Sequence, residues 1–219
     1  MRHFSIQSSF RRALCAGVAL VTFSALGLTA ANAQSYPNKP IKFVVPFSAG
    51  SATDNVGRIL AQAMGEAMGQ TITVENKAGA NGILGAEVVK AAPADGYTFL
   101  VTTSTTQAAN VHLYRKLPYD PVKDFTPIGK VGEVGFILMV NNDFPAKDMK
   151  EFIAYAKANP GKLAFGHGSS GSLVSAAMLS ELASLQTINV PYKSIPPALT
   201  DLLGGQIQFA FADTGNAVS

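Results

Sequence analysis

Apolar and polar positions along this chain follow two alternating spacings. Short uninterrupted apolar runs, such as residues 41–46 (IKFVVP), are typical of buried strands, whereas apolar residues three and four positions apart, as in residues 52–68, indicate helices. The runs predict strands over residues 41–46, 71–75, 97–102, 134–140, 163–165, 188–190 and 207–212. The helical spacing predicts helices over residues 52–68, 83–92, 107–114, 147–158, 172–183 and 196–203. This regular alternation predicts βαβ units and a mainly parallel α/β sheet.

The first 33 residues follow a different pattern. Three arginines precede an uncharged, mostly apolar stretch over residues 13–30, and a small-x-small site, Ala31-Asn32-Ala33, follows it. This order predicts a secretory signal peptide cleaved after Ala33 rather than a membrane-spanning helix, so we expect the protein to be exported. The chain's one cysteine, Cys15, lies inside this segment. We therefore expect no disulfide, thiol catalysis or cysteine-ligated metal in the mature chain.

Removing the signal peptide changes the charge of the chain. The full sequence has 17 Lys and Arg against 14 Asp and Glu, and three of the basic residues but none of the acidic ones precede residue 34. The remainder is therefore balanced at 14 of each, so the basic character belongs to the signal and gives no reason to expect a nucleic-acid partner. The 186 residues after Ala33 suffice for one large or two small domains.

Two loops rich in Gly and Ser each follow a predicted strand and open a predicted helix. The first loop is residues 47–54 (FSAGSATD), and the second loop is residues 166–172 (GHGSSGS). In an open α/β sheet, ligands bind beyond the carboxyl ends of the strands, and a helix N-terminus there offers free N–H groups and a partial positive charge to an anion. Together the loops predict a clamp for an anionic ligand. Taken singly, each loop has an ordinary explanation in which Asp54 or Ser172 caps its helix.

Long motifs around both loops resemble the Bug-type receptors, which are the TctC-like substrate-binding proteins of tripartite tricarboxylate transporters. The motifs are YPNKPIKFVVPFSAGSATDNVGRILAQAMGEAMGQTITVENKAGANG, APADGYTFLVTTSTTQAANVHLYRKLPYDPVKDFTPIG, AKANPGKLAFGHGSSG and VPYKSIPPALTDLLGGQIQFAFAD. The resemblance implies a two-lobed α/β fold of the type II, Venus-flytrap periplasmic-binding-protein kind, with lobes over residues 34–138 and 139–219. Family members run considerably further, so we expect the C-terminal part of this fold to be missing from the chain.

The resemblance also implies a function. It describes a monomeric periplasmic protein, without catalysis, cofactor or metal, that captures a small carboxylate and delivers it to a membrane permease. A further lining segment, which we call the threonine segment, is residues 102–107 (TTSTTQ). The implied ligand contacts are Phe47, Ser48, Ala49, Gly50, Ser51, Thr53, Asp54, Thr103, Ser104, Gln107, Gly168, Ser169, Ser170, Gly171, Ser172 and Asp213.

Two features of the first loop bear on how a carboxylate would bind. Ser48 and Ser51 stand where the family pattern FPPGGxTD has Pro and Gly, so we expect a different pocket shape and polarity. Neither loop contains an arginine, so we expect N–H groups near Gly50 to Thr53, rather than a guanidinium, to bind the carboxylate. We also expect Gly50→Val to abolish binding and to leave thermal unfolding nearly unchanged.

Three other functions fit parts of the pattern. Gly166-x-Gly168-x-x-Gly171 matches the dinucleotide fingerprint, but it lies outside the first βαβ unit, and no acidic residue follows at about 20 residues to hold a ribose. His167 beside Ser169 and Ser170 leaves open a Ser/His hydrolase or another small-molecule enzyme on the same cleft, although a triad also needs an orienting acid and an oxyanion hole. The third alternative is an α/β domain whose Gly/Ser loops bind nothing.

Overall fold

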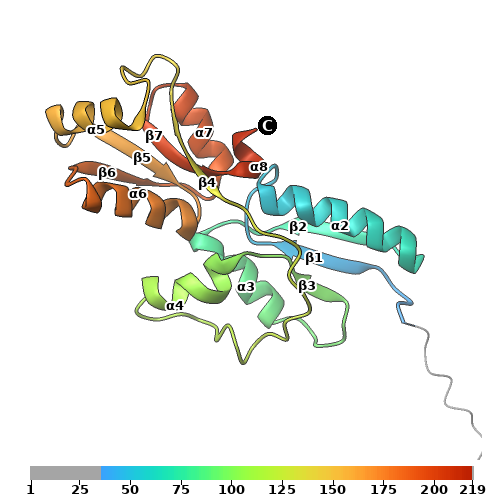
Figure 1. Ribbon diagram of the computed structural model, residues 1–219. Helices are drawn as coiled ribbons and strands as arrows, with labels where there is room; N and C mark the ends of the chain where they lie inside the picture. The colour runs from blue at the N-terminus through green and yellow to red at the C-terminus, as the bar shows by residue number, and fades with distance from the viewer. Residues whose placement is uncertain (1–35, 219) are drawn as a thin grey trace, which may run out of the picture. The chain divides into compact units, whose positions relative to one another are not determined.

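The chain forms two separate β-sheets, each flanked by helices (Figure 1). The computed structural model describes residues 36–218, so the predicted signal peptide lies outside the described residues. The strands are β1 (Ile41–Val45), β2 (Ile72–Asn76), β3 (Thr98–Leu100), β4 (Phe136–Val140), β5 (Leu163–His167), β6 (Thr187–Pro191) and β7 (Phe209–Asp213). The helices are α2 (Ala52–Met68), α3 (Ile83–Lys90), α4 (Asn110–Leu113), α5 (Met149–Ala158), α6 (Ser170–Leu182), α7 (Ile195–Leu203) and α8 (Thr214–Ala217), with shorter turns η1 (Ala80–Gly82) and η2 (Thr105–Ala109).

The three-stranded sheet has the order β2-β1-β3, and all its strands are parallel. Apart from the exposed Lys42, its central strand β1 is apolar, because helices cover both faces. Ile41 and Phe43 pack with Ala61 of α2 on one face. Leu100 of β3 packs with Ile83 of α3 on the other. The first loop leaves the carboxyl end of β1, and the threonine segment follows β3.

The four-stranded sheet has the order β4-β7-β5-β6. β5 runs parallel to β6 and β7, while β4 runs antiparallel to β7, so the prediction of a mainly parallel α/β arrangement is confirmed with one exception. Phe165 and Phe209 join a core with Phe152 of α5. Ala164 and Ala210, which are adjacent in sequence to these two phenylalanines, face a second core that includes α7. The second loop begins with the last two residues of β5 and opens α6.

Three parts of the chain differ from the sequence prediction. The expected lobe boundary between residues 138 and 139 falls inside β4, all five residues of which pair with β7. The expected short helix over residues 107–114 starts two residues earlier, as the π-helical turn η2 ahead of α4. The four-residue helix α8 was not predicted, because a single turn has no periodicity to detect.

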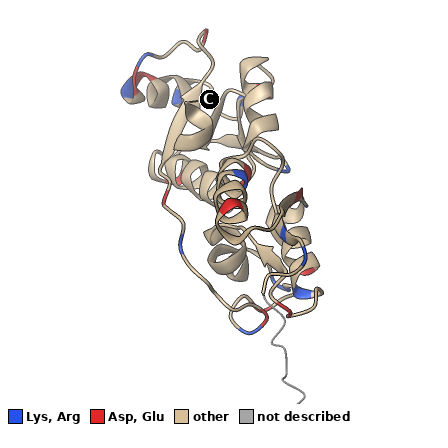
Figure 2. Cartoon of the chain, turned by 90° about the vertical axis from the view of Figure 1, so that its right-hand side faces the viewer, with Lys and Arg blue, Asp and Glu red and all other residues tan. Residues whose placement is uncertain are grey.

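Positively and negatively charged residues are interspersed along the chain (Figure 2). Several of them pair with one another. Lys39 lies 2.8 Å from Asp95, and Lys90 lies 2.9 Å from Asp124. These exposed pairs fit the balanced composition and contribute little to stability. Within residues 36–218, no helix is both long and apolar enough to cross a membrane.

Candidate functional site

The first loop is organised by the cap of α2. Ser51 is the N-cap residue, and its hydroxyl accepts the N–H of Asp54 at 3.2 Å. Asp54 reaches back and accepts the N–H of Gly50 at 2.9 Å. The alternative in which Asp54 caps the helix is therefore wrong, because Asp54 is the third helical residue and the shorter serine side chain occupies the cap position.

Asp54 is tied to the protein rather than open to a ligand. Its side chain is 2% exposed and accepts hydrogen bonds from Arg58 Nε at 3.0 Å and Asn76 Nδ2 at 2.8 Å. Burial raises the pKa of this carboxyl, but the bonds from Arg58, Asn76 and Gly50 outweigh burial and leave the pKa below its usual value. Asp54 therefore stays ionised and holds the first loop against β2. Sequence reasoning did not identify Arg58 or Asn76, which lie outside the loops.

Between Gly50 and Thr53, two backbone amides remain available to an anion. The N–H of Gly50 donates to Asp54, and the N–H of Ser51 donates to the carbonyl of Ser48 at 3.1 Å. Among the described residues, the N–H groups of Ala52 and Thr53 have no acceptor. They are the first two helical residues of α2, where the helix dipole is positive. The expected donor set near Gly50 to Thr53 thus narrows to two amides.

The backbone of Gly50 is in the left-handed region, with a φ of +78°. A β-branched residue is strongly disfavoured there. The expectation that Gly50→Val would leave thermal unfolding nearly unchanged is therefore wrong, and that variant cannot separate binding from stability.

The second loop uses its polar groups internally. Ser169 caps α6 in a capping box with Ser172, whose hydroxyl accepts the N–H groups of Gly168 and Ser169 at 3.1 Å each. Ser172 is fully buried and also donates to the carbonyl of Ser169 at 2.9 Å. Ser172 is therefore the third helical residue and not the cap. Among the described residues, the N–H of Gly171 is the amide of the first turn that lacks an acceptor.

The glycines of the second loop are required by packing. A Cβ on Gly168 would lie 2.0 Å from the carbonyl carbon of Ser194, at the start of α7. A Cβ on Gly171 would lie 2.2 Å from the Phe136 ring of β4. At both positions another segment of the protein packs directly on the loop backbone, which only glycine allows. The implied ligand contact would require glycine for the same reason.

The threonine segment meets the second loop directly. Thr105 Oγ1 accepts the N–H of Ser170 at 3.3 Å and the Ser170 hydroxyl at 2.9 Å. Thr103 Oγ1 accepts the N–H of Thr105 at 3.2 Å. Of the other implied contacts here, Ser104 is exposed, and the side-chain oxygen of Gln107 is buried without a partner among the described residues.

Asp213 ends β7 and caps α8. Its two carboxylate oxygens accept the backbone N–H of Asn216 at 3.0 Å and the Asn216 amide at 2.7 Å. A Cβ on Gly215 of α8 would lie 3.0 Å from the Cβ of Ala52. The β7–α8 corner therefore lies beside the free amides of the first loop, although the Asp213 carboxylate itself is occupied.

The remaining first-loop residues divide between core and surface. Phe47 is buried, and its carbonyl accepts the amide of Asn76 at 3.0 Å. Ser48 is half-buried, and Ala49 is exposed. A Cβ on Gly82, in the turn η1, would lie 2.6 Å from Thr106 and 3.8 Å from Phe47. This turn is therefore a neighbour of the first loop that no sequence motif indicated.

His167 and the neighbouring serines are not arranged as a nucleophile and its base. Burial lowers the pKa of His167, and the neighbouring Asn189 offsets only part of this effect. The Ser169 hydroxyl lies 3.2 Å from that of Ser172, and the Ser170 hydroxyl donates to Thr105. This geometry does not favour a Ser/His hydrolase.

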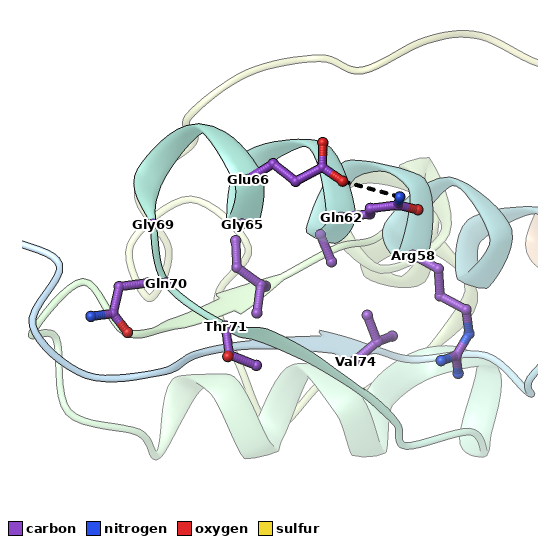
Figure 3. A pocket seen from close by; sticks show the side chains of 10 residues that line it. Arg58, Gln62, Gly65, Glu66, Gly69, Gln70, Thr71 and Val74 are labelled. Atoms are coloured by element: carbon purple, nitrogen blue, oxygen red, sulfur yellow. Dashed lines mark hydrogen bonds between the residues drawn. The ribbon is translucent and has the colours of Figure 1, made fainter.

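A shallow pocket of about 570 Å³ lies between α2 and β2 (Figure 3). Arg58, Gln62, Glu66 and Gln70 line it together with apolar residues of β2. None of the implied contact residues lines this pocket, so the candidate site is defined by the convergence of loops and not by this pocket.

Comparison with known proteins identifies the family. The family model described as "Tripartite tricarboxylate transporter family receptor" matches residues 56–219. BugT of Bordetella pertussis is 38% identical over 181 residues, which are 80% of this chain and 55% of BugT. The UPF0065 protein in the gbd 5' region of Cupriavidus necator is 40% identical over 212 residues, which are 91% of this chain and 62% of that protein.

Solved structures give the same result. MatC from Rhodopseudomonas palustris with bound malate has a TM-score of 0.78 and 36% identity, covering 84% of this chain and 63% of MatC. Rpa4515 of R. palustris with adipate has a TM-score of 0.79 and 32% identity, covering 81% of this chain and 60% of Rpa4515. The chain thus spans less than two thirds of the length of each of these relatives. The predicted periplasmic-binding-protein fold and the predicted resemblance are confirmed, and the chain belongs to the tripartite tricarboxylate transporter receptor family.

Proposed function

We propose that this chain is the ligand-binding part of a non-catalytic periplasmic receptor that captures a small carboxylate and presents it to a membrane permease. Family membership supports the receptor and transport roles. The malate and adipate bound by two similar proteins support a dicarboxylate as the ligand class. We further propose that the receptor is monomeric and needs no cofactor. We also propose that the first lobe of the receptor ends before Phe136, so that the whole of β4 belongs to the second lobe.

The free amides at the start of α2 carry this proposal. One carboxylate of the ligand accepts hydrogen bonds from the N–H groups of Ala52 and Thr53, at the positive end of the helix dipole. The hydroxyls of Ser48 and Thr53 are further donors on the same loop. On the other side of the ligand, the second loop supplies the N–H of Gly171. Charge-assisted bonds to backbone N–H groups suit a carboxylate in the absence of a loop arginine.

The experiment tests binding first and the amides second. The purified protein is screened by thermal shift against mono-, di- and tricarboxylates, and each hit is measured by titration calorimetry. A ligand that binds only the folded state stabilises it by ~2.7 kcal/mol at a hundredfold excess over Kd. No shift with any acid, from a protein that unfolds cooperatively, would contradict the proposed function.

Ala52→Pro then removes one free amide without breaking a hydrogen bond of the protein. Proline is favoured at the first helical position, and Ser51, at φ −69° and ψ 156°, already has the extended backbone that a following proline requires. We expect at least about tenfold weaker carboxylate binding with near-normal unfolding, because a bond to a charged group is lost. Met149→Pro, at the first position of α5, is the matched control and should bind normally. Equal affinities in all three proteins would exclude the Ala52 amide as a donor.

Export is tested separately. We expect the periplasmic fraction to contain a protein whose first residue is Gln34, as determined by N-terminal sequencing. An intact N-terminus in the cytoplasm would contradict the periplasmic assignment.

A further inference from the structure

A single hydroxyl joins the threonine segment to the second loop. Thr105 Oγ1 accepts two hydrogen bonds from Ser170, one from the backbone N–H at 3.3 Å and one from the hydroxyl at 2.9 Å. Thr105 follows the three-stranded sheet, and Ser170 is the first residue of α6 in the unit built on the four-stranded sheet. Thr105 is 2% exposed and Ser170 is 3% exposed. An N-terminal amide of α6 is thus satisfied by a side chain from the other sheet's unit.

Thr105 is held in place from behind. Its own N–H donates to Thr103 Oγ1, and the carbonyl of the next residue, Thr106, accepts the Tyr119 hydroxyl at 2.7 Å. Tyr119 in turn accepts the Asn110 amide at 3.3 Å, and Asn110 is fully buried. These bonds fix the π-helical turn η2, a kind of turn that often lies at functional sites. Thr105 is therefore presented to Ser170 by a rigid support.

The contact has a consequence for any ligand held between the first and second loops. Such a ligand binds only the arrangement in which the two loops face each other. The apparent affinity is the intrinsic affinity multiplied by the fraction of molecules in that arrangement. If the part of the chain built on the three-stranded sheet moves away from the part built on the four-stranded sheet, the Ser170 amide and hydroxyl lose Thr105 Oγ1 as their shared acceptor. The two bonds to Thr105 therefore raise the population of the facing arrangement.

We propose that Thr105 is a positioning residue that latches the second loop in its ligand-binding arrangement through Ser170, without touching the ligand. This inference rests on the proposed carboxylate-binding function. Because the latch changes a population and not a ligand contact, its loss should weaken every ligand by the same factor.

The test compares Thr105→Val, which keeps the shape and removes the acceptor, with Thr105→Ser, which keeps the hydroxyl. Thr200→Val, at an exposed position of α7, is the control for the substitution itself. Kd is measured by calorimetry for two carboxylates of different length, and koff by stopped flow. We expect Thr105→Val to raise both Kd values about tenfold and by the same factor, mainly through koff. Thr105→Ser should stay within about threefold of wild type, and Thr200→Val should bind as wild type does.

Each other outcome has a distinct meaning. Unequal factors for the two ligands would show that Thr105 touches the ligand, and tighter binding would show that it competes with the ligand for the Ser170 amide. Either result overturns the latch, as does unchanged binding in Thr105→Val. If Thr105→Val does not fold, Ser170→Ala removes the hydroxyl donor and should weaken the binding of both ligands equally, by about threefold.

A wild-type protein that binds no carboxylate would contradict the proposed function. Hydrogen exchange at the Ser170 amide, which needs no ligand, would then decide the latch alone. We expect exchange there to be at least about tenfold faster in Thr105→Val, and unchanged exchange would overturn it.

Discussion

The first and second loops have similar sequences but use their polar groups differently. Both follow the carboxyl end of a strand, open a helix and begin that helix with a serine cap. In the first loop, the third helical residue is Asp54, which anchors the loop to Arg58 and Asn76, and the two amides that start α2 have no acceptor among the described residues. In the second loop it is Ser172, whose short hydroxyl takes up two amides of its own loop. In the proposed binding mode, the first loop therefore supplies two N–H donors at the start of α2, whereas the second loop supplies one and acts mainly as a brace held by its neighbours.

The largest expected effect tests the second loop as a brace. Gly168→Ala places a Cβ 2.0 Å from the Ser194 backbone, which cannot move aside as a flexible side chain could. We expect a loss of at least about 3 kcal/mol in the free energy of unfolding, measured by urea denaturation. Gly132→Ala is the control, since a Cβ there has no neighbour within 4 Å. If both variants unfold at the same urea concentration, close packing at Gly168 is not what the second loop depends on.

The next effect tests the anchor of the first loop. Asp54→Asn removes a charged carboxylate that accepts three hydrogen bonds. We expect the free energy of unfolding to fall by about 1–3 kcal/mol. This is less than for a fully buried ion pair, because Arg58 is half-exposed. The pKa of Asp54 is lower in the folded protein than its ordinary value of 3.8, so the folded state binds fewer protons. The contribution of Asp54 is therefore complete above pH 3.8 and is lost as the pH falls through the lowered pKa.

Thermal unfolding of the wild type and Asp54→Asn from neutral pH down to acid pH measures this contribution. The two melting temperatures should differ most at neutral pH and approach each other in acid. A constant difference across the series would mean that the ionised form of Asp54 is not what stabilises the loop.

The sequence predicted the elements well and the roles of the loop residues less well. The apolar periodicity located α2 and the strands, because burial on a sheet imposes a spacing that is local in sequence. The loops were also found, because Gly and Ser after a strand are a local signal. The N–H donors near Gly50 to Thr53 were likewise expected, but the anchoring of the loop side chains could not be predicted, because it depends on partners distant in sequence, such as Asn76 for Asp54 and Thr105 for Ser170. The caps lie three residues before Asp54 and Ser172, because each loop also contains an earlier serine, Ser51 or Ser169, that can occupy the cap position.

The smallest expected effect comes from comparing two serine caps, one whose hydroxyl forms a hydrogen bond with its helix and one whose hydroxyl does not. Ser194 caps α7, but the second and third residues of that helix are Pro196 and Pro197, which have no N–H to donate. Ser194 is 1% exposed, and its buried hydroxyl consequently has no partner among the described residues. Ser169→Ala, at the bonded cap of α6, should cost about 1 kcal/mol of unfolding free energy.

Ser194→Ala, by contrast, should be neutral or up to about 1 kcal/mol stabilising, because it removes a buried hydroxyl that has no bond to lose. The two alanine variants share a substitution, a cap position and a neighbourhood, since Gly168 packs on Ser194 next to Ser169. Urea unfolding under the same conditions compares them directly. A cost at Ser194 equal to that at Ser169 would mean that the Ser194 hydroxyl has a partner in solution, and the β6–α7 corner would then join the second loop as part of the brace.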